Sequence, residues 1–151
     1  RNPVDVVDEI QYYVKKYKVK CIEFADLTTM TKKSWINKFC QELIDRDLKI
    51  VWQLSGGTRT EAIDENIIIK AKKAGCVYLG FAPESGSKKV LKEVNKQVDL
   101  DRMFKLFKIA KKHKMGTRAN IILGFPNDTR ITILQSLWMQ IRLVFLNVLC
   151  Q

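Results

Sequence analysis

Short apolar runs alternate with amphipathic helical segments along almost the whole chain, and this alternation limits the possible fold more than any other feature. The predicted strands cover residues 20–26, 49–55, 77–82 and 117–125. The first predicted helix begins at Pro3, and the others cover residues 31–46, 64–75, 87–94, 101–113, and from about 129 into the tail. Because strands that alternate with helices pair in parallel through right-handed crossovers, we expect an α/β fold.

Successive side chains of a strand point to opposite faces of the sheet, and here the two faces differ in chemistry. One face is apolar and suits helix packing: Ile22, Phe24, Ile50, Trp52, Leu54, Val77, Leu79, Phe81, Ala119, Ile121 and Leu123. The other is small or polar: Glu23, Ala25, Gln53, Ser55, Tyr78, Gly80, Ala82, Glu84, Arg118, Asn120 and Gly124. A doubly wound sheet carries helices on both faces and should be apolar on both. The polar face therefore favours a ligand-holding partial barrel over an open doubly wound sheet or a hydrated lumen without ligand.

The length and composition fit one domain over residues 1–151, with 46% hydrophobic residues to fill a core. Four strands are too few for a complete eight-stranded barrel, which takes about 250 residues. No G-x-G-x-x-G follows the first strand, so a Rossmann dinucleotide site is disfavoured. Hydrolase and NTPase functions are also disfavoured, because the chain has neither a Ser-His-Asp pattern nor a Walker loop.

Basic residues outnumber acidic ones, with Lys+Arg 27 against Asp+Glu 16 and a net charge of +11. This charge is compatible with nucleic acid, phosphates or an anionic membrane as partners. The lysines are spread over every predicted helix, so a solvated coat is favoured, nucleic acid is not, and no membrane partner is expected. The four cysteines lack metal-ligand spacing, and without a signal peptide they are expected to be reduced thiols of a cytoplasmic protein.

The carboxyl ends of the predicted strands are polar or rich in glycine, and ligands of parallel α/β folds bind at such ends. They carry Asp26, residues 55–59, residues 84–87 and residues 124–129. Any one of these residues can equally be a helix cap, and Glu84 can form an ordinary surface ion pair with Lys88. Four such ends on one rim favour a binding site, at which Gly86 is expected to let a ligand approach the backbone.

The segment "FAPESGSKKVLKEVNKQVDLDRM", followed by "ANIILGFPNDT", resembles the radical S-adenosylmethionine superfamily, above all members with a cobalamin-binding domain ahead of the radical domain. "IEFADLTTM" and "LSGGTRTEAIDE" are similar to the intervening segments of these proteins, and the resemblance runs from about Arg1 to Leu137. It implies a six-unit partial (βα) barrel, of which residues 1–151 would supply about four units. It also implies reductive cleavage of S-adenosylmethionine at a [4Fe-4S] cluster, which gives a 5′-deoxyadenosyl radical.

The resemblance assigns cofactor-binding residues but no catalytic residue. Asp26 would lie where the family binds the methionyl amine, and Lys96 would pair with the methionyl carboxylate. Glu84 and Asn120 would lie near the ribose or the methionine.

Further residues of the same implied site lie at its mouth and beside the adenine. Ser55 and Arg59 would line the mouth, and Ser85 belongs to the family's Glu-Ser-Gly-Ser-like run. Gly124 and Pro126 would shape the turn beside the adenine.

The chain departs from the family pattern in its cysteines and in one turn. The family's Cys-x-x-x-Cys-x-x-Cys is absent, although such a cluster requires thiolate ligands, so we expect the chain alone to hold no metal and to be inactive. We also expect the first strand with its cluster loop, and the last strand, to be missing. Asn127 and Asp128 replace the usual Gly-Glu, and the apolar tail is either a helix that packs on absent parts or a truncation artefact.

Three functions stay open at this point. The first is a fragment of a radical S-adenosylmethionine enzyme associated with cobalamin, whose partners are an unknown substrate and the missing parts of its own barrel. The second is a tRNA-modifying member of the same superfamily, similar to methylthiotransferases, and the third is a scaffold without activity. Exposed strand edges at the missing strands predict self-association.

Overall fold

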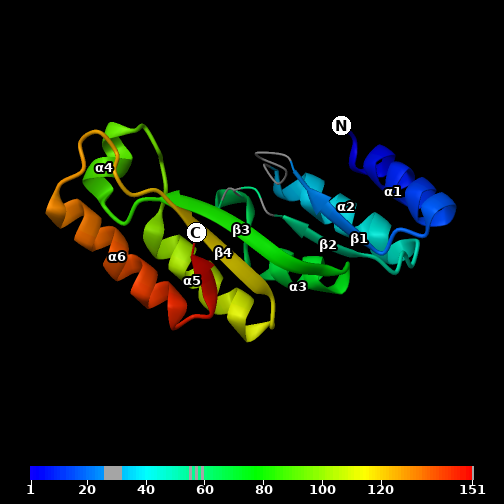
Figure 1. Cartoon of the computed structure of the whole chain (residues 1–151). Coiled ribbons are helices and arrows are strands. Elements are labelled where there is room, and N and C mark those ends of the chain that lie inside the picture. The colour runs from blue at the N-terminus through cyan, green and yellow to red at the C-terminus, as the bar shows by residue number, and fades with distance from the viewer. Residues whose placement is uncertain (26–31, 55, 57, 59, 151) are drawn as a thin grey trace.

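The computed structural model describes residues 1–25, 32–54, 56, 58 and 60–150, and its strands form one parallel sheet in the order β1-β2-β3-β4-β5. The strands are β1 (Cys21–Phe24), β2 (Val51–Leu54), β3 (Cys76–Glu84), β4 (Gly116–Ile121) and β5 (Val148–Cys150). Between them lie α1 (Pro3–Tyr17), α2 (Lys33–Asp45), the 3-10 turn η1 (Thr60–Ala62), α3 (Glu65–Lys73), α4 (Lys88–Glu93), α5 (Leu100–Lys112) and α6 (Arg130–Val144). Figure 1 shows α2, α3 and α5 along one side of the sheet, with α1 and α4 at opposite ends.

The helices begin where short polar side chains can cap them. The Asn2 side chain accepts a hydrogen bond from the Val4 N–H at 3.0 Å, just before Pro3. Asp64 accepts from the Ile67 N–H at 2.9 Å at the start of α3. The α/β class and the parallel sheet predicted from the sequence are confirmed, and these two caps explain why the helices begin where the pattern indicated.

The predicted division of the sheet into two faces is confirmed over the middle of the strands. Trp52, Leu54, Leu79, Phe81, Ala119 and Ile121 are buried in the core. Gln53, Tyr78, Arg118 and Asn120 point to the opposite side and are half-buried, and we call these four residues the polar face. Figure 1 shows α2, α3 and α5 packed along one side of the sheet, which explains why that face is apolar.

The alternation fails at two positions where the strand register shifts. A shift between Trp52 and Gln53 buries Cys76 in place of Val77, which was predicted to be internal and is 38% exposed. A second shift lies between Phe81 and Glu84, so alternation does not place the Glu84 side chain. Leu123 was also wrongly predicted to be internal, because β4 ends at Ile121 and leaves Leu123 46% exposed.

The tail contains a fifth strand where a continuous helix was expected. Helix α6 ends at Val144, and Asn147 adopts a left-handed φ of 60° before β5 begins at Val148. Strand β5 pairs in parallel with β4 through Thr117, Arg118 and Ala119. The described chain therefore supplies five parallel strands, and the expectation of four is corrected.

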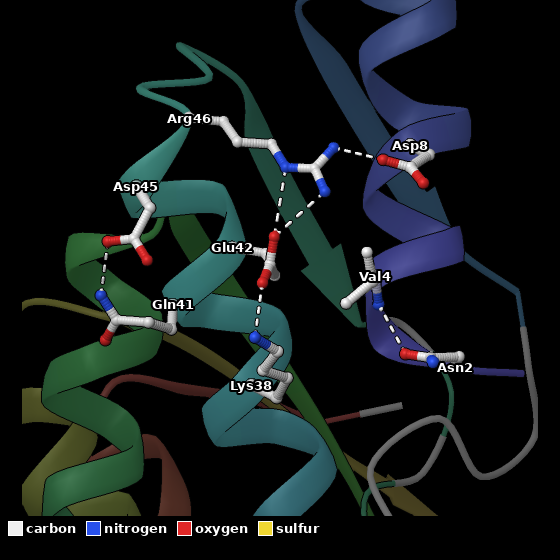
Figure 2. A network of polar contacts seen from close by, with 8 residues as sticks. All are labelled: Asn2, Val4, Asp8, Lys38, Gln41, Glu42, Asp45 and Arg46. Carbon is white, nitrogen blue, oxygen red and sulfur yellow. Dashed lines mark hydrogen bonds and ion pairs between the residues drawn. The ribbon is translucent and has the colours of Figure 1, made fainter.

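Helices α1 and α2 are joined by a network of charged side chains around Arg46 (Figure 2). The Arg46 guanidinium donates to Glu42 at 3.0 and 3.2 Å and also to Asp8 of α1. Lys38 forms an ion pair with Glu42 at 2.7 Å. This network raises the pKa of Arg46, chiefly through Asp8, and lowers the pKa of Glu42, chiefly through Lys38. No helix within the described ranges is both long and apolar enough to cross a membrane.

Candidate functional site

Glu84 and Lys96 meet at the carboxyl end of β3, where the sequence predicted a ligand site. The Lys96 ammonium lies 2.8 Å from a Glu84 carboxylate oxygen, and the two side chains are 40% and 20% exposed. The alternative partner considered for Glu84, Lys88, is not the one found. Two residues that the sequence assigned to the same site, and that the short helix α4 separates, are therefore in contact. A carboxylate and an ammonium side by side can bind a zwitterionic ligand by exchanging partners with it.

The end of α4 directs Lys96 toward β3. Asn95 adopts a left-handed φ of 52°, so the chain reverses after Val94. The Lys96 N–H then donates to the Leu91 carbonyl at 2.8 Å, and the Asn95 N–H donates to the Lys92 carbonyl at 3.2 Å. These two bonds form a Schellman motif, which fixes the backbone of Lys96 relative to α4.

Glu84 has a strained backbone that is held by β4. Its φ is 64°, in the left-handed region that a glutamate rarely adopts, and it directly follows Pro83. The Ile122 N–H donates to the Glu84 carbonyl at 2.7 Å, which holds the strand end in place. Backbone strain of this kind persists only where the surroundings impose it, and it is concentrated at functional positions.

Ser85 and Gly86 attach the turn after β3 to helix α6. The Ser85 and Ser136 hydroxyls are 3.1 Å apart, and the Gly86 N–H donates to the Ser136 oxygen at 2.9 Å. A Cβ on Gly86 would lie 2.6 Å from the Gln135 carbonyl oxygen. The close neighbour of Gly86 is thus the α6 backbone, which corrects the expectation that a ligand approaches there. The Ser85 side chain is engaged within the fold, and the ligand contact assigned to it stays a prediction.

Asn120 places a buried, unpartnered acceptor on the polar face. Among the described residues no group hydrogen-bonds to its Oδ1, which is inaccessible to solvent. A buried acceptor without a partner costs about 1–3 kcal/mol, which a bound ligand with a hydroxyl or amine donor would recover. Of the predicted site residues, Asn120 is therefore the one with a buried side-chain oxygen that the described fold leaves unsatisfied.

The turn after β4 is organised by Asp128, the residue that replaces the family's glutamate. Its Oδ2 accepts from the Gly124 and Phe125 N–H groups, both at 2.9 Å, and its Oδ1 accepts from the Thr132 hydroxyl at 2.7 Å. These hydrogen bonds, chiefly the one from Thr132, lower the pKa of Asp128. Gly124 has a φ of 92° and open space around its Cα, while Pro126 is exposed. The shorter carboxylate therefore stabilises the turn and leaves room beside Gly124.

Asp26, Ser55 and Arg59, which were also predicted to bind the cofactor, lie outside the described residues. A hollow of about 420 Å³ between α4 and α5 is lined by Lys88, Leu91, Lys92 and residues 96–101, so it includes Lys96 but no residue of the polar face. The predicted site consequently depends on the Glu84–Lys96 pair, Asn120 and the Gly124 turn.

Strand alternation indicates that Tyr78 and Arg118 lie on the polar face, but it does not predict that they pair. Arg118 Nε donates to the Tyr78 hydroxyl at 3.1 Å, and the guanidinium carbon lies 5.4 Å from the centre of the tyrosine ring. The two residues belong to neighbouring strands, and both had been placed on the polar face by strand alternation. A contact between the two side chains could be predicted for residues at matching positions of adjacent parallel strands, but the sequence does not give the strand register.

The cysteines of this chain do not fit an iron–sulfur cluster. Cys21, Cys40, Cys76 and Cys150 belong to β1, α2, β3 and β5, and within the described ranges no three metal-binding side chains converge. Burial raises the pKa of Cys40 and of Cys76 to about 12, so both remain thiols at neutral pH. Cluster ligation needs thiolates, and these residues are not placed to supply them.

Residues 1–137 match the family model of the radical SAM superfamily. Over 134 residues the chain is 31% identical to an anaerobic magnesium-protoporphyrin IX monomethyl ester cyclase of Rubrivivax gelatinosus, a match that covers 88% of this chain and 24% of the relative. Over 126 residues it is 30% identical to an uncharacterized methyltransferase of Pyrococcus horikoshii, covering 83% and 27% of the two chains. The chain thus spans about a quarter of the length of these relatives.

Solved structures share the fold at low sequence identity. The radical S-adenosylmethionine methyltransferase TsrM of Kitasatospora setae, with cobalamin and a [4Fe-4S] cluster bound, superposes with a TM-score of 0.79 and 14% identity, covering 95% of this chain and 27% of that chain. Coproporphyrinogen III oxidase of Escherichia coli, a radical SAM enzyme, gives a TM-score of 0.69 and 18% identity, covering 98% and 37%. These similarities concern the fold, and they agree with a parallel sheet that forms part of a barrel.

Proposed function

Because this chain belongs to the radical S-adenosylmethionine superfamily, we propose that it is part of an enzyme and supplies the surface that binds S-adenosylmethionine. Membership supports radical chemistry that depends on this cofactor. Reductive cleavage of S-adenosylmethionine at a [4Fe-4S] cluster, which yields a 5′-deoxyadenosyl radical, is the activity that we propose for the parent protein. The cysteines of this chain do not fit the cluster, so its ligands would come from a segment outside the chain, and the chain alone would be inactive.

The meeting of Glu84 and Lys96 at 2.8 Å is the observation that carries this proposal, and Ile121, which is opposite Glu84 in the strand register, directly follows Asn120 with its unpartnered oxygen. Lys96 would pair with the methionyl carboxylate, and Glu84 would accept a hydrogen bond from a ribose hydroxyl or from the methionyl amine. Asn120 Oδ1 would accept from a second hydroxyl, which would satisfy an acceptor that the fold itself leaves unpaired. The open space beside Gly124 would accommodate the flat face of an adenine.

Cobalamin is a further cofactor that we propose for the parent protein. The solved structures with the same fold include TsrM with cobalamin bound and a cobalamin-dependent radical enzyme, OxsB, with aqua-cobalamin and S-adenosylmethionine bound. The OxsB structure superposes with a TM-score of 0.66 and covers 87% of this chain. We assign no residue of this chain to cobalamin, and we propose that an additional domain would hold it.

The proposal is tested by measuring S-adenosylmethionine binding to the 151-residue chain by isothermal titration calorimetry. Losing a hydrogen bond to a charged group costs about 1.5–3 kcal/mol, so Glu84→Gln and Lys96→Gln should each weaken binding by roughly tenfold or more. Glu65→Gln is the matched control, because Glu65 pairs with Lys112 on the helical layer at 3.0 Å and loses the same charge. Absence of binding by the wild-type chain would instead favour a scaffold without cofactor.

A further inference from the structure

We propose that Arg118 and Tyr78 form an anion-binding subsite on the polar face, which takes a carboxylate or phosphate group of the substrate. The subsite rests on the proposed function, because it treats the polar face as the wall of a substrate cavity. None of the residues assigned to S-adenosylmethionine is part of it. Four observations carry the proposal: the packing of Tyr78, the charge of Arg118, the position of both residues along the strands, and the unpartnered residue beside them.

Gly116 allows the Tyr78 ring to lie across the neighbouring strand. Tyr78 and Gly116 are opposite each other in the β3–β4 register. A Cβ on Gly116 would lie only 2.7 Å from Tyr78 Cδ2 and 3.1 Å from the Val77 carbonyl oxygen. A side chain at position 116 would therefore displace the ring. With glycine there, the Tyr78 hydroxyl reaches Arg118 Nε at 3.1 Å.

The Arg118 guanidinium is held in place by the tyrosine, yet it has no anionic partner in the described part of the chain. Its Nε–H is used by Tyr78, and its carbon lies 5.4 Å from the ring centre. None of the ion pairs formed by described residues includes Arg118. By contrast, Arg46 contacts two carboxylates. A positioned guanidinium retains two terminal NH₂ groups, whose geometry matches the two oxygens of a carboxylate or phosphate.

The subsite lies deeper along the strands than the Glu84–Lys96 pair. Arg118 is opposite Gly80, whereas Glu84 is opposite Ile121, three residues farther along β4. At about 3.3 Å per residue this separation is roughly 10 Å. A cofactor at the carboxyl end of β3 and an anionic substrate group at Arg118 would thus lie at different distances along the strands.

On β4, Asn120 lies between Arg118 and the position opposite Glu84. It lies two residues after Arg118 on the same side of β4, and its buried Oδ1 has no partner within the described residues. Polar groups that are ready to bind therefore continue from the mouth to Arg118. A surface that served only to fill a hydrated lumen would not be expected to leave both a fixed cation and a buried acceptor unpaired.

The test follows the side-chain Nε–Hε signal of Arg118 in NMR spectra of the ¹⁵N-labelled chain. Sodium acetate and inorganic phosphate are titrated separately at constant pH and constant ionic strength, which is kept with sodium chloride. If only phosphate moves the Arg118 signal to saturation, the subsite takes a phosphate group of the substrate. If only acetate does so, the subsite takes a carboxylate. Saturation with both anions supports a subsite that accepts either group. No saturable movement with either would overturn the proposal.

Three variants separate the subsite from general attraction to a chain with a net charge of +11. Tyr78→Phe removes the hydroxyl that orients Arg118 and should weaken anion binding by roughly tenfold, while Arg118→Gln should abolish it. Arg142→Gln removes the same charge from α6, where the Arg142 guanidinium carbon lies 4.3 Å from the centre of the Phe104 ring, and should leave the titration unchanged. Equal, linear movement of the Arg118 and Arg142 signals would overturn the subsite.

Titrating the chain with S-adenosylmethionine as well as with anions shows whether the subsite or the proposed function is wrong. Binding of S-adenosylmethionine that leaves the Arg118 signal free to titrate with anions supports both. An Arg118 signal that saturates in a chain without affinity for S-adenosylmethionine removes the proposed function and leaves an anion site. Competition between S-adenosylmethionine and acetate at Arg118 would overturn the assignment to the substrate, because the cofactor's own carboxylate would then occupy the subsite.

Discussion

Glu84 combines an expected ligand contact with a backbone conformation that disfavours glutamate. A residue with a Cβ in the left-handed region costs about 1–2 kcal/mol, whereas glycine adopts it freely. We therefore expect Glu84→Gly to be more stable than Glu84→Ala by about 1 kcal/mol, because both variants lose the ion pair with Lys96 and only alanine keeps the strain. Urea unfolding with equal m-values for the two variants measures this difference.

Glu93 provides the control, because it lies in helix α4 and also has a surface ion pair, with Lys89. Glu93 is the last helical residue of α4, so glycine there should be less stable than alanine, by up to about 1 kcal/mol. The opposite signs at positions 84 and 93 would separate backbone strain from loss of charge. An alanine variant at position 84 as stable as the glycine variant would show that the strain at Glu84 is not significant.

The sequence could indicate that Glu84 ends a strand at a polar rim, but not which residue it would contact. The Lys96 partner depends on the left-handed turn at Asn95, which reverses the chain after a short helix. The same limit applies to the Tyr78–Arg118 contact, which depends on the register of β3 against β4 and on the missing side chain at Gly116. Contacts between polar side chains follow from such details of geometry, and hydrophobic periodicity does not encode them.

Helix α6 and the turn after β3 are joined through backbone contact at Gly86. A methyl group on Gly86 would meet the Gln135 carbonyl oxygen at 2.6 Å and Ser136 Cα at 2.8 Å, and neither backbone atom can move without displacing the helix. We expect Gly86→Ala to destabilise the protein by at least about 2 kcal/mol. Thermal and urea unfolding measure this loss.

Gly124→Ala is the comparison for this contact, because a Cβ there meets nothing within 4 Å. Because only the left-handed φ of 92° disfavours alanine there, Gly124→Ala should lower the free energy of unfolding by about 1 kcal/mol. A Gly86→Ala variant with wild-type stability would show that α6 is not fixed to the β3 turn. Ser136, which accepts from Gly86 and contacts Ser85, would then have little influence on the position of the turn.

Elements with a clear hydrophobic pattern were predicted well, whereas the short strand β5, which depends on its neighbour, was not. The first four strands stand out as apolar runs, and Asn2 and Asp64 mark two helix starts. Strand β5 has three residues within an apolar tail and exists because β4 offers it an edge. The pattern of α6 is also misleading, because its buried side includes Thr132 and Ser136 while much of its apolar side is exposed.

The surface of the whole molecule carries an apolar row along α6 that the described chain does not cover. The row comprises Ile131, Leu134, Trp138, Ile141 and Phe145, which recur at helical spacing and are between 48% and 77% exposed. Exposed apolar rows of this kind mark association sites or aggregation hazards. The parallel edges of the sheet at β1 and β5 add the hazard that was expected from the sequence.

We expect the chain to self-associate in a concentration-dependent way, and more strongly at high salt, because salt screens the repulsion from a net charge of +11. Trp138→Glu should reduce the association while leaving the thermal unfolding temperature within a few degrees of wild type, because Trp138 is 62% exposed. Sedimentation velocity over a concentration series, at low and at high salt, measures this change.

Tyr17→Glu is the matched control, because Tyr17 on α1 is 59% exposed and lies outside the row. If α6 carries the association, the Tyr17 variant should sediment like the wild type, and only the Trp138 variant should become monomeric. Equal loss of association in both variants would attribute the effect to the added negative charge. Persistent association in both would point to the sheet edges, since strand pairing uses backbone groups that neither substitution changes.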